Sequence, residues 1–122
     1  MDKLNDIIID KNFNLSEFEC QCCKRVMLHS DLLKLLVKLR RSIGQPILIN
    51  SGYRCKLFNK QVGGVPTSYH LFGMAADIYV KNYPIQDLIV HADIVGFTGI
   101  GAYNTFVHVD VRPEKERWDN RT

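Results

Sequence analysis

The stretch 30–49 constrains the fold most, because it contains a helix, a stop signal and a strand in direct succession. A capping residue, Ser30, is followed by apolar residues at helical spacing with basic residues between them: Leu32, Leu35, Leu36, Leu39 and Ile43. Gly44 stands where a helix ends in a left-handed residue, and Pro46 prevents its continuation. We therefore predict a helix that ends at Gly44 and a strand that begins after Pro46, through Ile47, Leu48 and Ile49.

Shorter patterns elsewhere in the chain predict further helices and strands. A short helix is expected near 16–19, and another from Pro84, which suits a first turn, to about Ile94. Three apolar, β-prone runs are expected to be strands: 74–80, 99–103 and 106–111. Asn104 and Thr105 between the last two favour a tight hairpin. The predicted class is α+β, with a small, partly antiparallel sheet and flanking helices.

The length of 122 residues, of which 46% are hydrophobic and 24% charged, fits one core. No repeat, low-complexity stretch or linker divides the sequence, so we predict a single domain over 1–122. After Pro113 the chain is polar, and we expect a loose end there. Trp118 is the exception, and we expect it to fold back over apolar surface.

The net charge of +3 is too small to indicate a nucleic-acid partner, and no binding motif accompanies it. The dense basic group Lys38, Arg40 and Arg41 is interpreted as the solvated face of a helix. The start, 1–10, has neither the basic end nor the long apolar stretch of a secretory signal. No apolar run approaches the about 20 residues needed to span a bilayer. We therefore expect no membrane span and a protein that is cytoplasmic as synthesised. We also expect a monomer.

Four cysteines are crowded into two short segments: Cys20, Cys22, Cys23 and Cys55. Such crowding suggests a metal knuckle, yet the CxCC spacing lacks the paired CxxC units of a zinc ribbon. We interpret the four side chains as small, partly buried thiols of a reducing compartment, with a second metal site as the alternative.

The segment SYHLFGMAADI at 68–78 contains two potential metal ligands, His70 and Asp77. On one regular strand their odd separation would place the two side chains on opposite faces. They converge only where the chain turns between them, and Gly73 supplies the backbone freedom for such a turn.

A third potential ligand, His108, lies in FVHVDVR, where alternate residues of a strand project to opposite faces. Val107, Val109 and Val111 mark the buried face, so His108 and Asp110 share the other one. A polar pair that projects from a strand needs partners, and a divalent cation would supply one. Two imidazoles, a carboxylate and a water form a tetrahedral zinc site with an exchangeable position. Solvated or hydrogen-bonded side chains are the alternative interpretation.

Several motifs occur together in this sequence: SGYRC at 51–55, Asn59, VGGV at 62–65, SYHLFGMAADI at 68–78 and GIGAYNTFVHVDVRP at 99–113. In these motifs the chain resembles the M15 family of zinc D-Ala-D-Ala peptidases over about residues 13–118. The resemblance implies the hedgehog/D-Ala-D-Ala peptidase fold, with one zinc ion in a cleft on the sheet.

The resemblance places the family's three zinc ligands on His70, Asp77 and His108. The family's substrate-anchoring arginine falls on Arg54, which we count among the catalytic residues. A guanidinium directly after a buried strand can form a bidentate bond to a peptide carboxylate. A surface salt bridge is the alternative role for Arg54.

The catalytic base of related enzymes lies two or three positions before the third ligand, where this sequence has Phe106 and Thr105. Neither side chain accepts a proton at neutral pH. Asp110 is the nearest acid on the same strand face, and we nominate it as the base. Orientation of a ligating histidine is an equal alternative for Asp110. Hydrogen bonds to substrate or oxyanion are expected from side chains that could equally have local structural roles: Ser68, Tyr69 and Tyr103.

The resemblance implies a zinc metallopeptidase in which zinc activates a water molecule for attack on peptide bonds of peptidoglycan stem peptides. The enzyme would be a D-Ala-D-Ala carboxypeptidase or an endolysin-like endopeptidase that reaches the cell wall by an endolysin-like route. The alternative is a zinc-containing, non-catalytic binding module of the same fold, because hedgehog signalling domains resemble these peptidases while acting as ligands.

Overall fold

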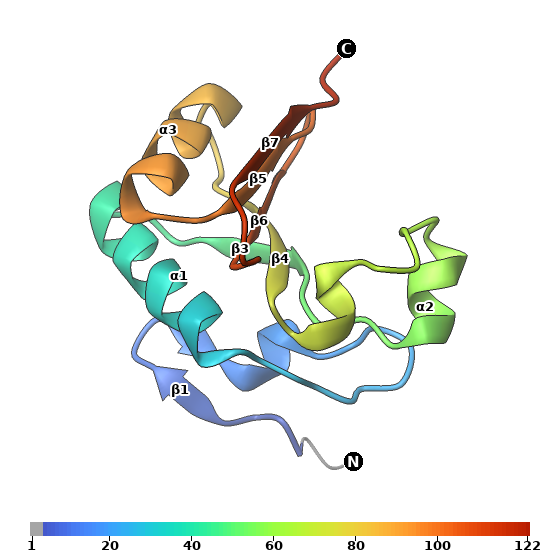
Figure 1. The fold of residues 1–122 in the computed structure, drawn as a ribbon. Helices are drawn as coiled ribbons and strands as arrows, with labels where there is room; N and C mark the ends of the chain where they lie inside the picture. The colour runs from blue at the N-terminus through green and yellow to red at the C-terminus, as the bar shows by residue number, and fades with distance from the viewer. Residues whose placement is uncertain (1–3) are drawn as a thin grey trace.

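The main sheet of the protein is built from five strands in the part of the chain that the computed structural model describes, residues 4–122 (Figure 1). Its strand order is β3-β4-β6-β5-β7, and neighbours are antiparallel except for the parallel pair β5 and β7. The bounds are Leu48–Ser51 for β3, Ala75–Tyr79 for β4, Gly99–Ala102 for β5, Val107–Asp110 for β6 and Glu116–Asp119 for β7. The predicted α+β class and the partly antiparallel sheet are confirmed.

One face of this sheet is covered by two helices, α1 (Ser30–Ile43) and α3 (Ile85–Val95), which pack against each other (Figure 1). The core between them and the sheet is formed by apolar side chains from both helices and from the sheet, among them Leu32, Leu36, Leu39, Leu88, Ala92, Ile78, Val107 and Val109. As predicted, the valines of β6 point into this core. The alternation of a strand then directs His108 and Asp110 to the opposite face.

Shorter elements lie around the other face and the lower end of the sheet (Figure 1). They are β1 (Ile8–Asp10), β2 (Phe13–Asn14), η1 (Leu15–Phe18), α2 (Lys56–Gln61) and η2 (Tyr69–Phe72), where η denotes a 3-10 helix. The short helix expected near 16–19 corresponds to η1. The β1–β2 hairpin and α2 were not predicted, because such short elements leave little periodicity in the sequence.

Helix α1 has the predicted bounds, but its cap is His29 rather than Ser30. The imidazole of His29 accepts a hydrogen bond from the backbone N–H of Asp31 at 3.1 Å, which makes Ser30 the first helical residue. Gly44 has a φ of 74°, the left-handed conformation predicted for it. Similarly, Pro84 immediately precedes α3 instead of occupying its first turn.

The hairpin predicted between β5 and β6 is present, and the N–H of Tyr103 donates to the carbonyl of Phe106 at 3.1 Å. The expectation of a loose end after Pro113 was wrong, because Glu116–Asp119 forms β7. Its backbone pairs with β5, so that Trp118 stands opposite Gly101, and its other three side chains are exposed. Among residues 4–122 no helix is long and apolar enough to cross a membrane.

Candidate metal centre

Two histidines and an aspartate from three elements meet on the face of the sheet opposite α1 and α3. The Nε2 atom of His70 lies 3.2 Å from Oδ1 of Asp77, and Nδ1 of His108 lies 3.1 Å from the same oxygen. All three side chains are buried, and one ligand atom from each lies within 4.8 Å of the others. The structure thus brings together the three residues selected as metal ligands from the sequence.

The local backbone explains this convergence. Asp77 and His108 are directly paired neighbours on β4 and β6, so their side chains leave the sheet on one face. His70 lies in η2, and Gly73 at a φ of 66° ends η2 and turns the chain into β4. A Cβ atom at Gly73 would also overlap the backbone of Met27. As predicted, a turn at Gly73 brings the two candidate ligands His70 and Asp77 together despite their odd separation.

In each imidazole, the ring nitrogen that faces away from Asp77 donates a hydrogen bond to an acceptor. Nδ1 of His70 lies 2.7 Å from the carbonyl oxygen of Gly52, which can only accept, so this nitrogen carries the proton. Nε2 of His108 lies 2.7 Å from Oδ2 of Asp110 and likewise donates. In the neutral rings, the inner nitrogens therefore direct lone pairs at the Asp77 carboxylate. A cation between the three groups would balance the negative charge of the carboxylate and accept the imidazole lone pairs. Two imidazole nitrogens and a carboxylate oxygen are ligand atoms that suit zinc.

The same hydrogen bonds shift the pKa values of Asp77 and His108. Burial alone would raise the pKa of Asp77, but the hydrogen bonds with His108 and His70 outweigh it and hold the pKa well below its usual range. Burial alone would lower the pKa of His108, but its bonds with Asp110 and Asp77 raise the pKa above 6.5. The same contacts thus favour the anionic form of Asp77 and the cationic form of His108.

Asp110, nominated as the catalytic base, is fully buried behind His108. Its Oδ1 accepts from the backbone N–H and from Nε of Arg112, at 3.0 Å and 2.9 Å. Its Oδ2 accepts from Nη2 of Arg112 at 2.6 Å in addition to Nε2 of His108. Both oxygens are therefore occupied, and the side chain does not line the cavity in front of the ligands. These contacts favour the orienting role over the base role.

Arg54 reaches the site from the loop between β3 and α2. Its Nη2 donates to Oδ2 of Asp77 at 3.0 Å, Nε to Oγ of Ser51 at 3.0 Å, and Nη1 to Oδ1 of Asn59 at 3.3 Å. Asn59 is buried and also donates to the carbonyl of Val65 at 2.8 Å. The guanidinium is thereby fixed beside the candidate metal centre, with remaining N–H groups at the cavity wall.

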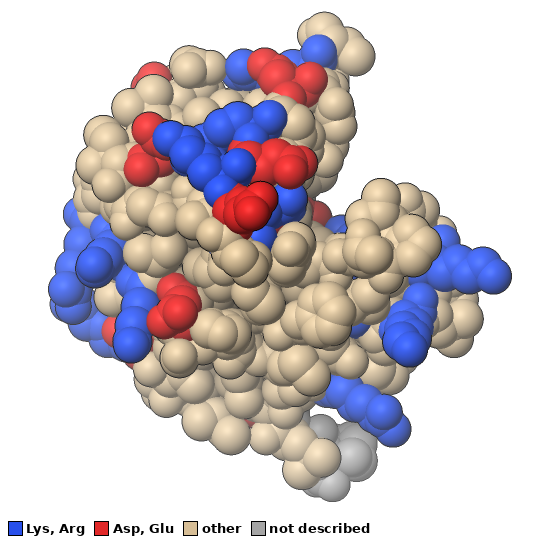
Figure 2. Space-filling model, viewed as in Figure 1, with Lys and Arg blue, Asp and Glu red and all other residues tan. Residues whose placement is uncertain are grey.

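A cavity of about 610 Å³ opens in front of the three candidate ligands. Figure 2 shows the molecule hollowed between the region of β5 and β7 and the region of α2. Ser68 and Tyr103, both predicted to contact substrate, line this cavity together with Arg54. Ser68 also accepts a hydrogen bond from the N–H of His70, and the Tyr103 hydroxyl accepts one from Trp118 Nε1. Both residues therefore have the structural role given as the alternative, and line the cavity as well.

Three residues after β6 line the cavity but were not predicted there: Arg112, Glu116 and Trp118. Trp118 lies over Gly101, where a Cβ atom would overlap the indole, and its ring centroid is 5.1 Å from that of His108. The guanidinium of Arg112 lies over the rings of Tyr69 and Trp118, at 4.7 Å and 5.0 Å. The alternation of ERWD was the available signal, because it places Glu116 and Trp118 on one face of a strand.

Comparison with known proteins agrees with this geometry. The model of the family described as Peptidase M15 matches residues 11–110. The zinc D-Ala-D-Ala carboxypeptidase of Streptomyces albus G is 34% identical over 80 residues, which cover 61% of this chain. The matched region covers only 31% of that relative, so the chain corresponds to about a third of its length. Because the family model matches most of the sequence, the protein belongs to the peptidase M15 family.

Proposed function

We propose that the protein is a zinc metallopeptidase of peptidoglycan, a D-Ala-D-Ala carboxypeptidase or an endolysin-like endopeptidase, with 1–122 acting as one domain and as a monomer. The observation that supports this most is the convergence of two imidazole lone pairs and one carboxylate oxygen at the floor of a cavity. Membership of the M15 family and the printed name of the Streptomyces relative point to the same chemistry.

In this proposal His70, Asp77 and His108 hold one zinc ion through Nε2, Oδ1 and Nδ1. A zinc ion in such a site supplies a Lewis acid and lowers the pKa of a bound water to about 7. The carbonyl of Gly52 and the carboxylate of Asp110 fix the tautomers and orientations of the two imidazoles. The chain therefore presents the two imidazoles in the tautomers that a metal requires.

Arg54 would bind the carboxylate of the substrate. Its guanidinium lies next to Asp77, so a bound carboxylate would be held a short distance from the ligand cluster. Arg54 keeps its orientation without substrate, because Ser51, Asn59 and Asp77 each accept one of its N–H groups. Such preorganisation lowers the entropic cost of positioning a peptide.

The catalytic base must be a side chain that lines the cavity and can accept a proton from water, and Asp110 does not line the cavity. Besides Asp77, Glu116 is the carboxylate among the residues that line the cavity. Its Oε1 lies 3.5 Å from Nη1 of Arg112, and its side chain is 61% exposed. We therefore assign the base to Glu116 and the orientation of His108 to Asp110, and both assignments are tested below.

The experiment that tests the function compares the wild type with His108→Ala and with His91→Ala. His91 lies on α3, where its Nδ1 is 2.7 Å from Oγ of Ser42, and serves as a histidine control. Zinc content and release of D-alanine from a D-Ala-D-Ala peptide are measured, together with cleavage of purified peptidoglycan. We expect His108→Ala to lose both zinc from this site and hydrolysis, and His91→Ala to retain both. Hydrolysis unaffected by His108→Ala would contradict the proposal.

The second candidate function is a zinc-containing binding module of the same fold. The observation that favours it is the absence of an acid or histidine at Thr105 and Phe106, where related enzymes have their base. Wild-type protein that holds zinc in this site, binds peptidoglycan and releases no product from either substrate would support the module and exclude the enzyme.

A further inference from the structure

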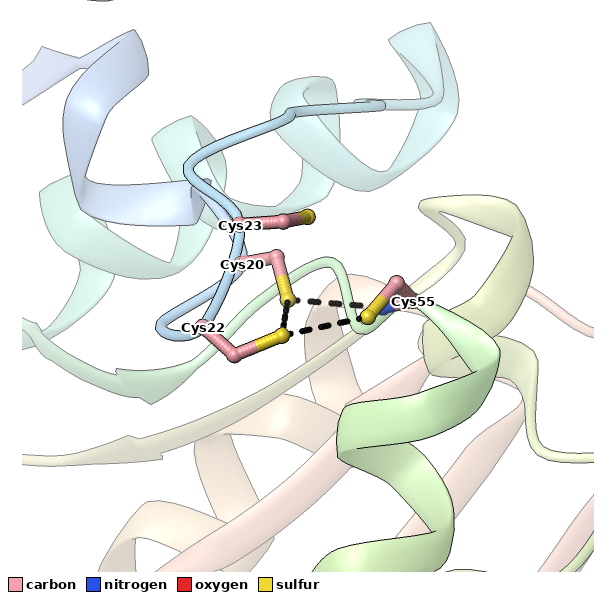
Figure 3. A group of neighbouring side chains, drawn as sticks. All are labelled: Cys20, Cys22, Cys23 and Cys55. Atoms are coloured by element: carbon pink, nitrogen blue, oxygen red, sulfur yellow. Dashed lines mark hydrogen bonds between the residues drawn. The ribbon is translucent and has the colours of Figure 1, made fainter.

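A second group of metal-binding side chains lies away from the cavity. Figure 3 shows Cys20, Cys22 and Cys23 on one loop and Cys55 directly before α2, with the sulfurs turned toward one another. The Sγ atoms of Cys22 and Cys55 are 3.3 Å apart, and those of Cys20 and Cys22 are 3.8 Å apart. All four sulfurs lie within 4.8 Å of one another. Residues 35 positions apart in the sequence thus converge on one point.

This spacing matches a tetrahedral thiolate site. A zinc–sulfur distance of about 2.3 Å places the sulfurs of such a site about 3.8 Å apart. A single disulfide would join two of the four sulfurs, whereas one metal ion can contact all four. All four cysteines are free thiols, of which Cys20 is buried while Cys22 and Cys23 are exposed. A metal ion can therefore enter from solvent and satisfy all four at once.

The backbone around Cys20 stabilises negative charge on sulfur. The N–H of Cys55 donates to Sγ of Cys20 at 3.4 Å, so the sulfur already accepts from the backbone on the Cys55 side. Four thiolates held this close together would repel one another, and a divalent cation between them removes this repulsion.

The loop that carries three of the cysteines is closed by its own backbone. The N–H of Cys20 donates to the carbonyl of Arg25 at 2.7 Å, and the N–H of Lys24 donates to the carbonyl of Cys20 at 2.9 Å. Lys24 has a φ of 64°, a left-handed backbone conformation that residues other than glycine rarely adopt. The tight turn directs the thiols of Cys20, Cys22 and Cys23 to the same side, toward Cys55.

We propose that Cys20, Cys22, Cys23 and Cys55 bind a second, structural zinc ion. Four thiolates favour zinc or iron over harder cations, and a site with four protein ligands has no open position for chemistry. The role of this ion is to join the loop at 20–25 to the start of α2. The alternative left open by the cysteine spacing in the sequence is thereby preferred over four independent thiols.

The second ion would also support the candidate metal centre. Cys55 follows Arg54 directly, and the N–H of Arg54 donates to the carbonyl of His70 at 3.1 Å. Gly52, whose carbonyl orients His70, lies against the backbone of Phe18, two residues before Cys20. A metal at the four thiols would fix both sides of the segment that positions Arg54 and His70. This inference does not rest on the proposed peptidase activity.

The test uses His108→Ala, which removes the first site and leaves all four cysteines. Zinc is measured per chain, and the ion is then exchanged for cobalt to record its absorption spectrum. We expect one zinc ion per chain in His108→Ala and two in the wild type. The cobalt form of His108→Ala should show thiolate-to-cobalt charge transfer and the visible bands of a tetrahedral site. A chelator should lower the melting temperature of His108→Ala and make all four thiols reactive to alkylation.

The matched variant is Cys22→Ser with Cys23→Ser, in which both altered side chains are exposed, so that folding is retained. It should bind one zinc ion per chain, in the first site, and its cobalt form should lack the charge-transfer bands. A folded His108→Ala that binds no metal would overturn the inference, as would an intact mass lower by two hydrogens that reveals a Cys22–Cys55 disulfide. Bound iron instead of zinc would overturn the metal assignment. Thiolate-bound zinc in a wild type without hydrolysis would support the inference while the proposed activity fails.

Discussion

Asp110 and His108 form a buried pair in which Oδ2 of the carboxylate lies 2.7 Å from Nε2 of the imidazole. They are two residues apart on β6, so both side chains leave the same face of the sheet. Arg112 holds the carboxylate through its backbone N–H and its guanidinium, and its guanidinium is stacked on Tyr69 and Trp118. Asp110 thus fixes the orientation of His108 from the side away from the cavity, which Asp110 itself does not line.

The first prediction separates the orienting residue from the base. Asp110→Asn should weaken zinc affinity at the first site by about 10–100-fold, and hydrolysis should return at saturating zinc, because only the support of His108 is weakened. Glu116→Gln should lower kcat by about 10²–10⁴-fold with unchanged zinc content. Both are checked by zinc titration and steady-state kinetics. If Asp110→Asn stays inactive at saturating zinc while Glu116→Gln is active, the two roles are reversed.

The second prediction concerns substrate anchoring by Arg54. Arg54→Lys keeps the charge but loses the planar fork that contacts Ser51, Asn59 and Asp77. We expect KM for a peptide with a free terminal carboxylate to rise about tenfold or more, and KM for the corresponding amide to change little. The ratio between the two substrates is the measured quantity, because it does not depend on zinc occupancy. Equal losses on both substrates would argue against a carboxylate-binding role.

The third prediction is the pH dependence of His108 in metal-free protein. Its pKa is raised above 6.5 by the bonds to Asp110 and Asp77 despite burial. The resulting stabilisation is full below about pH 6.5 and is lost as the pH rises through the folded-state pKa. An NMR titration of the imidazole, after removal of metal, checks the pKa, and urea unfolding at several pH values checks the stability. In Asp110→Asn the pKa should fall; an unchanged value would show that Asp110 is not its cause.

The fourth prediction tests the packing of Trp118 over β5. Gly101→Ala should destabilise the protein by about 1–3 kcal/mol, because its Cβ atom would overlap the indole of Trp118. In a Trp118→Ala background the same change should cost less, since the overlapping ring is gone. Chemical unfolding of the two single variants and the double variant completes the cycle. Additive losses would place the cause elsewhere than in the Gly101–Trp118 approach.

The candidate ligands could be assigned from the sequence because its motifs resemble those of the M15 family, and local signals explain how the three side chains can meet. Gly73 marks the turn between His70 and Asp77, and the alternation of FVHVDVR separates the core valines from His108. The helix from Ser30 to Ile43 was predicted for a similar reason, since a repeated apolar stripe and a glycine stop are properties of a short stretch of chain.

The roles of the surrounding residues were decided only by the tertiary structure. The choice between base and orienting group for Asp110 depends on Arg112, which occupies the carboxylate from the side away from the cavity. Glu116 and Trp118 reach the cavity because β7 pairs in parallel with β5, a long-range pairing without a local sequence signal.

The same distinction holds for the cysteines. The sequence by itself determined that four thiols occur in two short segments, whose spacing is unlike that of a zinc ribbon. Only the folded chain decided that Cys55 meets Cys20, Cys22 and Cys23 at one point. The physical reason is that backbone preferences and hydrophobic periodicity act over a few residues, whereas a site is completed by contacts between segments that only packing of the whole chain brings together.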